Sequence, residues 1–161
     1  DLDEKIFFFF EAVALTTVKK LNSPGIFAVE LFVDNHNNVW VNETAPRVHN
    51  SGHHSIEACY SSQFDMLWRI MLQYPLGNTK PIMAAAIVNL LGAPGFTGTV
   101  QYKGIEEVLS MPNVFVHLYG KAITKPGRKM GHVTVLSSDR QELLFRVNKI
   151  KNTLRVISDT P

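Results

Sequence analysis

The first third of the chain shows a helical hydrophobic pattern followed by a strand pattern. Apolar residues recur at helical spacing within residues 4–21, and the sequence Asn-Ser-Pro-Gly at residues 22–25 is typical of a helix end. The apolar residues of this stripe are Phe7, Phe8, Ala12, Leu15 and Val18. Residues 26–33 are rich in β-branched and aromatic side chains, residues 34–38 are polar, and residues 39–41 resume the strand pattern. The pattern predicts a packed helix and then a β-hairpin.

The rest of the chain alternates predicted helices and strands. Ser62 and Asp65 resemble a capping box at the start of a helix that runs to about Gln73. The expected strands span residues 82–91, 114–119 and 132–136, and the expected helices span residues 105–109 and 140–154. The last helix carries an apolar stripe made of Leu143, Leu144, Val147, Ile150 and Leu154. A change of pattern near residue 79 predicts two domains, residues 1–78 and 79–161, in an α+β protein.

Composition and charge narrow the classes of function. The chain has 161 residues, of which 45% are hydrophobic and 19% charged, and its formal net charge is +2. This balance is typical of a globular protein and gives no argument for a nucleic-acid partner. The apolar residues 6–10 are too few to span a membrane, and acidic residues precede them. The single Cys59 cannot form an internal disulfide. We therefore expect a cytoplasmic protein without a membrane anchor.

Two glutamates on the predicted hairpin are candidates for a metal site. If residues 35–38 form a four-residue loop, paired residue numbers sum to 73 and Glu30 lies opposite Glu43. Opposed carboxylates repel each other unless a cation lies between them, and Mg²⁺ is usually held by one or two carboxylates together with substrate phosphates. The alternative is a register shifted by one residue, which would leave two ordinary solvated glutamates. The hairpin by itself leaves both interpretations open.

Basic and imidazole side chains follow the second strand of the hairpin. Arg47 lies four residues after Glu43, and a guanidinium group binds planar oxyanions through paired hydrogen bonds. His49, His53 and His54 lack a recognised zinc-ligand spacing. We interpret His49 as a hydrogen-bonding or acid–base group. His53 and His54 are interpreted as residues that cap or pack the next helix.

A second basic segment spans residues 119–132. It contains glycines and four cations, which are Lys121, Lys125, Arg128 and Lys129. One interpretation is a solvated loop, which is the commonest state of such runs. The other is a phosphate site, because glycine allows close backbone approach while Lys and Arg neutralise the anion.

Several segments together carry a resemblance to a known family. They are G-I-F-A-V-E-L-F-V at residues 25–33, V-N-E-T-A-P-R-V-H-N-S-G-H-H at 41–54, S-Q-F-D at 62–65, P-L-G at 75–77, and Y-G-K with G-R-K-M-G-H at 119–121 and 127–132. From about residue 20 to 155 the chain resembles the C-terminal half of 5-(carboxyamino)imidazole ribonucleotide synthase, an ATP-grasp ligase of purine biosynthesis. The resemblance implies part of an ATP-grasp large lobe, an antiparallel sheet with covering helices. A small β-rich domain of the rudiment single hybrid type would follow it.

The resemblance implies roles for residues of the hairpin and the loop after it. Glu30 and Glu43 would hold Mg²⁺ against the phosphates of ATP. Asn42, together with Glu43, would lie next to the nucleotide. Arg47 and His49 would be catalytic residues that handle bicarbonate and the carboxyphosphate made from it.

The same resemblance implies a reaction and its partners. Lys121 and Arg128 would lie near the phosphates of the nucleotide and the ribonucleotide substrate. ATP and bicarbonate would be coupled to 5-aminoimidazole ribonucleotide to give the N-carboxylated product, ADP and phosphate. The implied assembly is a homodimer.

Three other functions are alternatives at this point. Two are related ATP-grasp enzymes, a formate-using glycinamide ribonucleotide transformylase and a biotin carboxylase, and the R-K-M-G-H motif argues against both. The third is a non-catalytic ATP-grasp remnant that serves as a binding or dimerisation module, and the intact set of Glu30, Glu43 and Arg47 argues against it. The chain has no initiator Met, so we interpret it as a fragment of a longer protein. The resemblance implies that this fragment is inactive alone, because the lid and the N-terminal substrate domain of the family have no counterpart in it. The four phenylalanines at residues 7–10 are interpreted as an interface exposed by truncation.

Overall fold

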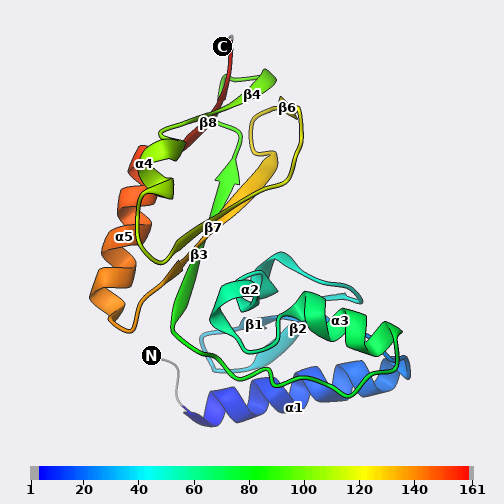
Figure 1. Cartoon of the computed structure of the whole chain (residues 1–161). Helices are drawn as coiled ribbons and strands as arrows, with labels where there is room; N and C mark the ends of the chain where they lie inside the picture. Colours follow the sequence, from blue (N-terminus) through cyan, green and yellow to red (C-terminus); the bar gives the residue numbers. More distant parts are fainter. Residues whose placement is uncertain (1–3, 160–161) are drawn as a thin grey trace. The chain divides into compact units, whose positions relative to one another are not determined.

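The protein forms two compact units in a computed structural model that describes residues 4–159 (Figure 1). The first unit contains the chain through His53 together with Ser61–Asn78, and the second contains His54–Tyr60 and the chain from Thr79 onward. Within each sheet the strands pair in antiparallel fashion. The expected mixed α+β class with antiparallel sheets is therefore confirmed.

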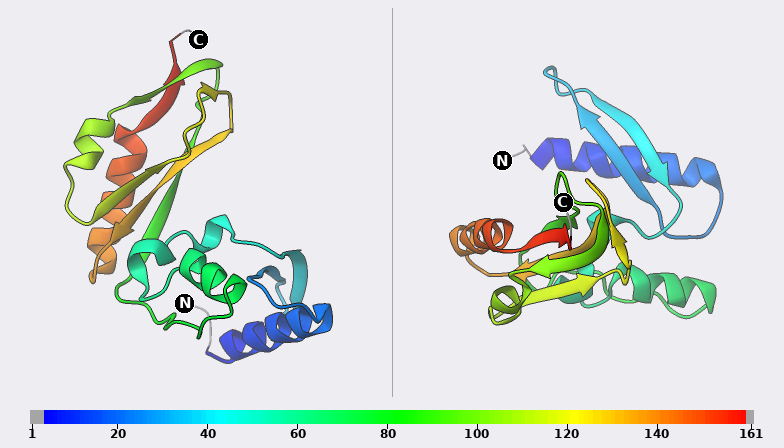
Figure 2. Two further views of the ribbon diagram at one scale, coloured as in Figure 1. Left: turned by 45° about the vertical axis from the view of Figure 1, so that its right-hand side comes forward. Right: turned by 90° about the horizontal axis from the view of Figure 1, so that it is seen from above.

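The first unit is built from one hairpin and its neighbouring helices. Its elements are α1 (Glu4–Leu21), β1 (Ala28–Val33), β2 (Val39–Ala45), the 3-10 turn η1 (Asn50–Gly52) and α3 (Gln63–Met71). The hairpin crosses α1, which contacts β2 (Figure 2). Helix α3 begins at Ser62, whose hydroxyl accepts a hydrogen bond from the Asp65 N–H at 3.1 Å. The helix, the hairpin and the cap at Ser62 were all expected from the sequence.

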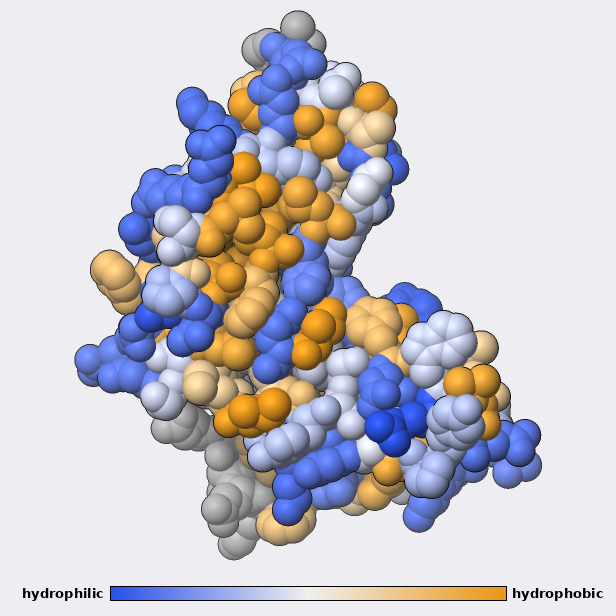
Figure 3. Space-filling model, viewed as in Figure 1, coloured by the Kyte–Doolittle hydropathy of each residue, from blue (hydrophilic) through white to orange (hydrophobic). Residues whose placement is uncertain are grey.

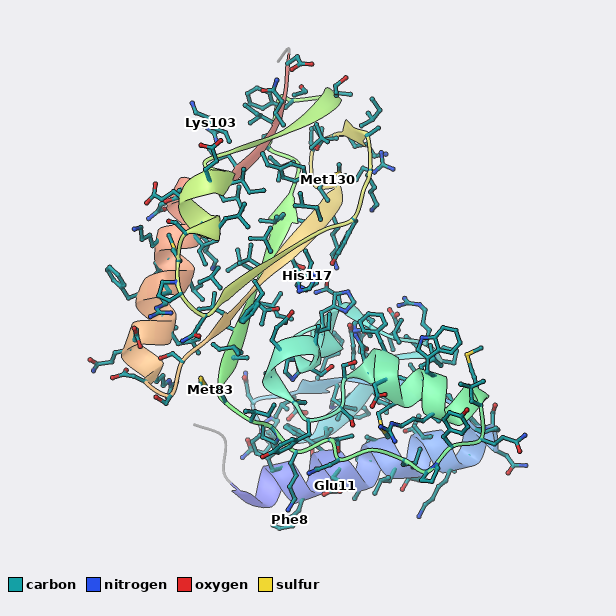
Figure 4. All side chains as sticks on the ribbon, viewed as in Figure 1. Phe8, Glu11, Met83, Lys103, His117 and Met130 are labelled. Carbon is teal, nitrogen blue, oxygen red and sulfur yellow. The ribbon has the colours of Figure 1, made fainter. Side chains whose placement is uncertain are left out.

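The covered side of α1 differs from the expected stripe. The half-buried residues are Phe10, Val13, Ala14, Thr17 and Val18. Their spacing of three and four residues is that of one helix face. Of the expected stripe only Val18 lies on this face, whereas Phe7 and Phe8 are 62% and 74% exposed. Figure 4 shows Phe8 pointing outward from the helix. The hydrophobic pattern predicted the wrong face of α1, because the covered face includes the weakly hydrophobic residues Ala14 and Thr17.

The second unit contains two three-stranded sheets. Its elements are α2 (Ser55–Ala58), β3 (Ala85–Leu91), β4 (Gly98–Lys103), α4 (Ile105–Leu109), β5 (Val114–Leu118), β6 (Ile123–Thr124), β7 (Lys129–Leu136), α5 (Arg140–Thr153) and β8 (Arg155–Ser158). The strand orders are β3-β7-β5 and β6-β4-β8. The sequence patterns missed α2, β4, β6 and β8, and β7 begins three residues before its expected start. Helix α2 and strands β6 and β8 have four residues or fewer, and such short elements leave little periodic signal. Strand β4 has six residues, as many as β1, so its length does not explain why it was missed.

The core of the second unit lies between the β3-β7-β5 sheet and helices α4 and α5 (Figure 1). Val133, Met130 and Ile150 are fully buried there. Leu144 does not belong to the core, since it is 54% exposed. The other residues of the expected α5 stripe are correct. Leu144 lies outside the covered face because it follows Leu143 directly, and successive residues of a helix point about 100° apart.

Large apolar side chains also remain on the surface of both units, as the orange areas of Figure 3 show. Among the residues that the structure describes, no helix combines the length and the apolar character needed to cross a membrane.

Candidate functional site

The hairpin pairs Glu30 with Glu43, as expected, but through an irregular register. Next to the turn Val33 pairs with Val39, so the register there is shifted by one residue from the expected four-residue loop. Asn42 is an additional residue in β2 and forms a β-bulge, after which Glu30 faces Glu43. The expected loop length was therefore wrong, and the bulge restores the expected pair. Opposed residues of an antiparallel pair share a face of the sheet, which places both glutamates on the same side.

Glu30 lies at the centre of the polar contacts around this bulge. The side-chain amide of Asn42 donates to Glu30 Oε2 at 3.2 Å. On the other oxygen, His49 Nε2 lies 3.5 Å from Glu30 Oε1. Glu30 and Glu43 are both exposed. The bulge thus holds one carboxylate between an amide and an imidazole and leaves the pair open to a ligand.

The donor set around the bulge fits Mg²⁺ bound together with a nucleotide. Within residues 4–159 no group of three or more His, Cys, Asp or Glu side chains could hold a metal ion. Two carboxylates leave most coordination positions to water and phosphate oxygens, which is how Mg²⁺ is usually bound beside a nucleotide. A structural zinc site needs four protein ligands of the nitrogen or sulfur type, and this hairpin does not supply them.

Arg47 lies in the loop after β2 and is exposed. Its Nη1 donates to the carbonyl oxygen of Val48 at 3.0 Å. The described part of the chain gives Arg47 no ion-pair partner. A guanidinium group has five N–H donors, so several remain for a planar anion. The fork of Arg47 is thus available for a ligand in this structure.

The imidazole ring of His49 has a polar neighbour at each nitrogen atom. The Ser51 N–H donates to Nδ1 at 3.4 Å, and the Ser51 hydroxyl lies 2.9 Å from the same nitrogen. Because Nδ1 accepts a hydrogen bond, Nε2 is the nitrogen that carries the proton in the neutral ring. That nitrogen faces Glu30. His49 therefore orients one of the expected metal ligands.

Gln63, the first residue of α3, fixes the backbone of the same loop. Its Oε1 accepts from the His49 N–H at 2.9 Å, and its Nε2 donates to the His49 carbonyl oxygen at 2.9 Å. The same Nε2 lies 2.8 Å from His53 Nδ1. A Cβ atom at Gly52 would lie 2.7 Å from Gln63 Oε1, so a side chain at position 52 would require this hydrogen-bonded amide to shift. Sequence reasoning missed this role, although its signal was present in the S-Q-F-D motif.

The other two histidines of the loop have structural contacts. The ring of His53 stacks on Phe64 with 5.6 Å between centroids, which confirms the expected packing. His54 occupies the N-cap position of α2, but its side chain makes no capping hydrogen bond. The expected cap is therefore wrong for His54.

The basic segment of the second unit connects β5 to β7, and both of its predicted phosphate residues are half-buried. Lys121 Nζ donates to the carbonyl oxygen of Lys129 at 2.7 Å, and Arg128 Nη1 donates to that of Ile123 at 2.8 Å. Gly127 has a φ of +73°, which favours glycine at this turn. Lys121 and Arg128 form no ion pair with the described acidic residues. Backbone carbonyl oxygens of the loop thus hold the Lys121 and Arg128 side chains in place, and no described acidic side chain pairs with either cation.

Two domain families match the sequence. Residues 3–64 match the ATP-grasp domain, and residues 85–146 match the phosphoribosylaminoimidazole carboxylase C-terminal domain. The first match contains the hairpin and the loop with Arg47 and His49. The second contains the basic segment with Lys121 and Arg128.

Curated relatives match most of the chain. The N5-carboxyaminoimidazole ribonucleotide synthase of Aquifex aeolicus is 34% identical over 145 residues, which cover 90% of this chain and 38% of the relative. The phosphoribosylaminoimidazole carboxylase of Ogataea methanolica is 36% identical over 152 residues, which cover 91% of this chain and 27% of the relative. The chain thus spans less than half the length of these relatives.

Solved structures show the same fold at similar identity. The N5-carboxyaminoimidazole ribonucleotide synthetase of Thermotoga maritima matches 98% of this chain and 44% of its own, with a TM-score of 0.92 and 40% identity. The synthase of Aspergillus clavatus, solved with ADP and 5-aminoimidazole ribonucleotide, matches 94% of this chain and 41% of its own, with a TM-score of 0.82 and 30% identity. The chain therefore belongs to the N5-carboxyaminoimidazole ribonucleotide synthase family and represents a C-terminal portion of it.

Proposed function

We propose that this chain is the C-terminal part of an ATP-dependent ligase that carboxylates 5-aminoimidazole ribonucleotide with bicarbonate in purine biosynthesis. The observation that carries the proposal is the pairing of Glu30 with Glu43 at the Asn42 bulge. The names of the relatives support it, as does the Aspergillus clavatus structure with ADP and 5-aminoimidazole ribonucleotide. The same proposal includes a homodimer and a cytoplasmic location. The single Cys59, which cannot form an internal disulfide, suits a reducing compartment such as the cytoplasm.

The hairpin residues would bind the metal–nucleotide complex. Glu30 and Glu43 would hold Mg²⁺, and Asn42 would orient Glu30 through the hydrogen bond that it already makes. Bound Mg²⁺ would neutralise charge on the β- and γ-phosphates of ATP. His49 would keep Glu30 in place from the opposite side of its carboxylate.

Arg47 would bind bicarbonate next to the transferred phosphoryl group. A bicarbonate oxygen attacks the γ-phosphorus, the bond to the ADP oxygen breaks, and carboxyphosphate and ADP form. The guanidinium of Arg47 would stabilise the negative charge that develops on this anion. The substrate amine would then attack the carboxyl carbon, phosphate would leave, and one proton would be released. His49, with Ser51 hydrogen-bonded to Nδ1 and Glu30 3.5 Å from Nε2, would act as an orienting donor in these steps.

Lys121 and Arg128 would bind phosphate groups of the ribonucleotide and the nucleotide. Their half-buried, backbone-tethered positions support this proposal, because an ordered cation loses less conformational entropy when it binds an anion. The absence of an acid paired with either cation in the described chain leaves their charge for a ligand.

The proposal is tested in the full-length polypeptide that carries this chain. ADP release should require 5-aminoimidazole ribonucleotide and bicarbonate together, with one carboxylated product formed per ADP. Formate with glycinamide ribonucleotide, and bicarbonate with biotin, serve as the competing substrate pairs. Faster turnover with either competing pair would assign the chain to a different ATP-grasp reaction, and nucleotide binding without any turnover would support a non-catalytic module.

A further inference from the structure

Four polar side chains form a continuous chain of contacts in the second unit, outside the residues assigned above. His117 Nε2 lies 2.6 Å from Glu57 Oε1 of α2. The ring of His117 stacks on that of His132, with 4.6 Å between centroids and 15° between planes. His132 Nδ1 lies 3.0 Å from the hydroxyl of Tyr119. These contacts thus connect α2 with the end of β5, where Figure 4 labels His117.

This chain of contacts lies on the face of the sheet that is opposite to α5. His117 and His132 are register partners in β5 and β7, so they share a face. Val133, the next residue of β7, packs into the core against α5. Successive side chains of a strand alternate between faces, which places both histidines on the side of α2.

The chain of contacts ends at Lys121, one of the two proposed phosphate residues. Lys121 Nζ lies 5.7 Å from the centroid of the Tyr119 ring, within the range of a cation–π contact. Burial raises the pKa of Tyr119 above its usual value, so the phenol stays protonated and can donate to His132. In the described chain Lys121 Nζ makes one backbone hydrogen bond, to Lys129, while an ammonium group has three donors. Two donors therefore remain for an anion.

Stability alone is a weak reason for this arrangement. The Glu57 side chain is only 11% exposed, and its Oε2 is buried without a hydrogen-bond partner. Pairing a largely buried carboxylate with one histidine gives little net stability, because the desolvation cost is of similar size to the attraction. His132 is 2% exposed, so a second polar group is buried beside the first. An arrangement with this cost is better explained by the geometry that it imposes on Tyr119.

We propose that Glu57, His117 and His132 are positioning residues that hold Tyr119, and through its ring the ammonium group of Lys121, ready to bind a phosphate monoester. The inference rests on the proposed role of Lys121 in substrate-phosphate binding and adds the residues that act behind it. Lysine has a flexible side chain, so a ring that restrains it lowers the entropy lost on binding.

The test measures binding of ribose 5-phosphate to the chain by NMR titration, with melting temperature recorded for each variant. Tyr119→Phe keeps the ring under Lys121 and removes the hydroxyl that His132 holds, and it should weaken binding about two- to tenfold. Tyr119→Leu also removes the ring and should weaken binding more, by up to about thirtyfold. Tyr102→Phe is the matched control, because the hydroxyl of this half-buried tyrosine of the same unit donates to the Met130 carbonyl oxygen and not to His132. That carbonyl oxygen keeps its hydrogen bond from the Tyr119 N–H when the Tyr102 hydroxyl is removed. Tyr102→Phe should keep the original affinity.

A double-substitution comparison separates positioning from simple stabilisation. In a Lys121→Ala background, Tyr119→Phe should no longer change the affinity, whereas any loss in melting temperature should persist. The ring-current shift of the Lys121 side-chain protons gives a second measurement without ligand, and it should collapse in His132→Asn and Tyr119→Leu but not in Tyr102→Phe. If Lys121→Ala binds the ligand too weakly to titrate, this shift decides whether His132 and Tyr119 position the Lys121 side chain.

The outcomes distinguish the positioning role of Tyr119 from the phosphate-binding role of Lys121. Unchanged affinity in Tyr119→Phe, or an equal loss in the Lys121→Ala background, would overturn the positioning role and leave the phosphate role of Lys121 intact. Unchanged affinity in Lys121→Ala, or no saturable binding by the unsubstituted chain, would overturn the phosphate role itself and the inference with it.

Discussion

Glu30 and Glu43 are partners across the hairpin because Asn42 is an extra residue in β2. Without this bulge, the register next to the turn would place Asn42 opposite Glu30 and move Glu43 to the other face. The bulge also brings the Asn42 amide to Glu30. Bulges bend a strand locally and are frequent next to active sites, where they redirect a side chain.

The hydrogen bond from Asn42 to Glu30 should matter for metal–nucleotide affinity. In the full-length polypeptide, Asn42→Ala should weaken Mg-ADP binding by about 10- to 100-fold, because groups that orient a metal-binding carboxylate have effects of this size. Calorimetric titration with Mg-ADP measures the effect, and Asn38→Ala in the hairpin turn serves as a control with little expected change. Equal affinities for Asn42→Ala and the unsubstituted protein would argue against Glu30 as a metal ligand.

Arg47→Lys should lower turnover far more than it lowers nucleotide affinity. Lysine keeps the positive charge but loses the planar fork, so the charge that develops as carboxyphosphate forms is stabilised less well. The expected loss in kcat is about 100- to 1,000-fold in the full-length polypeptide. Bicarbonate-dependent ADP release and carboxylation should fall together in steady-state kinetics. A loss confined to nucleotide binding would make Arg47 a nucleotide-positioning residue.

Gln63→Glu should loosen the loop that carries His49. The substitution keeps an acceptor for the His49 N–H but removes the donor to the His49 carbonyl and to His53. Leaving such part-buried groups unsatisfied costs about 1–3 kcal/mol. Amide hydrogen exchange at Ser51 should therefore accelerate, whereas exchange in α5 should not change. Protection of the loop at its original level would show that the amide of Gln63 does not hold it.

The turn of the hairpin should lose stability in acid. Hydrogen bonds from the Asn38 side chain, and then from the Asn38 backbone, lower the pKa of the Asp34 carboxyl from 3.8 to about 2. Because the folded-state pKa lies below the unfolded value, this contribution is fully present above pH 3.8 and is lost as the pH falls through about 2. A carboxyl NMR titration measures the pKa, and Asn38→Ala should raise it. A midpoint near 3.8 in the unsubstituted chain would contradict the turn geometry.

The corrected face of α5 predicts a contrast between two of its apolar residues. Ile150 is fully buried, so Ile150→Ala should lower the free energy of unfolding by about 2–5 kcal/mol. Leu144 is exposed, so Leu144→Ala should change it by no more than about 0.5 kcal/mol. Urea unfolding followed by circular dichroism compares the two. Similar losses would mean that Leu144 is covered in solution.

The sequence by itself determined the long elements and the local chemistry. Helices α1 and α5 and the β1–β2 hairpin follow from periodicity and turn residues, since both act over a few neighbouring positions. The grouping of Glu30, Glu43, Arg47 and His49 around one strand end was also predictable, because all four lie on or just after a single hairpin.

Tertiary structure alone decided the features that depend on distant parts of the chain. The face of α1 that is covered depends on β2, and the position of His49 depends on Gln63, 14 residues away. Glu57 and His117 are 60 residues apart and meet only because α2 packs on the β3-β7-β5 sheet. Hydrophobic patterns indicate which residues are buried, because they repeat with the local backbone period. Side-chain hydrogen bonds between remote segments leave no such periodic signal. Their geometry depends on how the folded backbone brings the segments together.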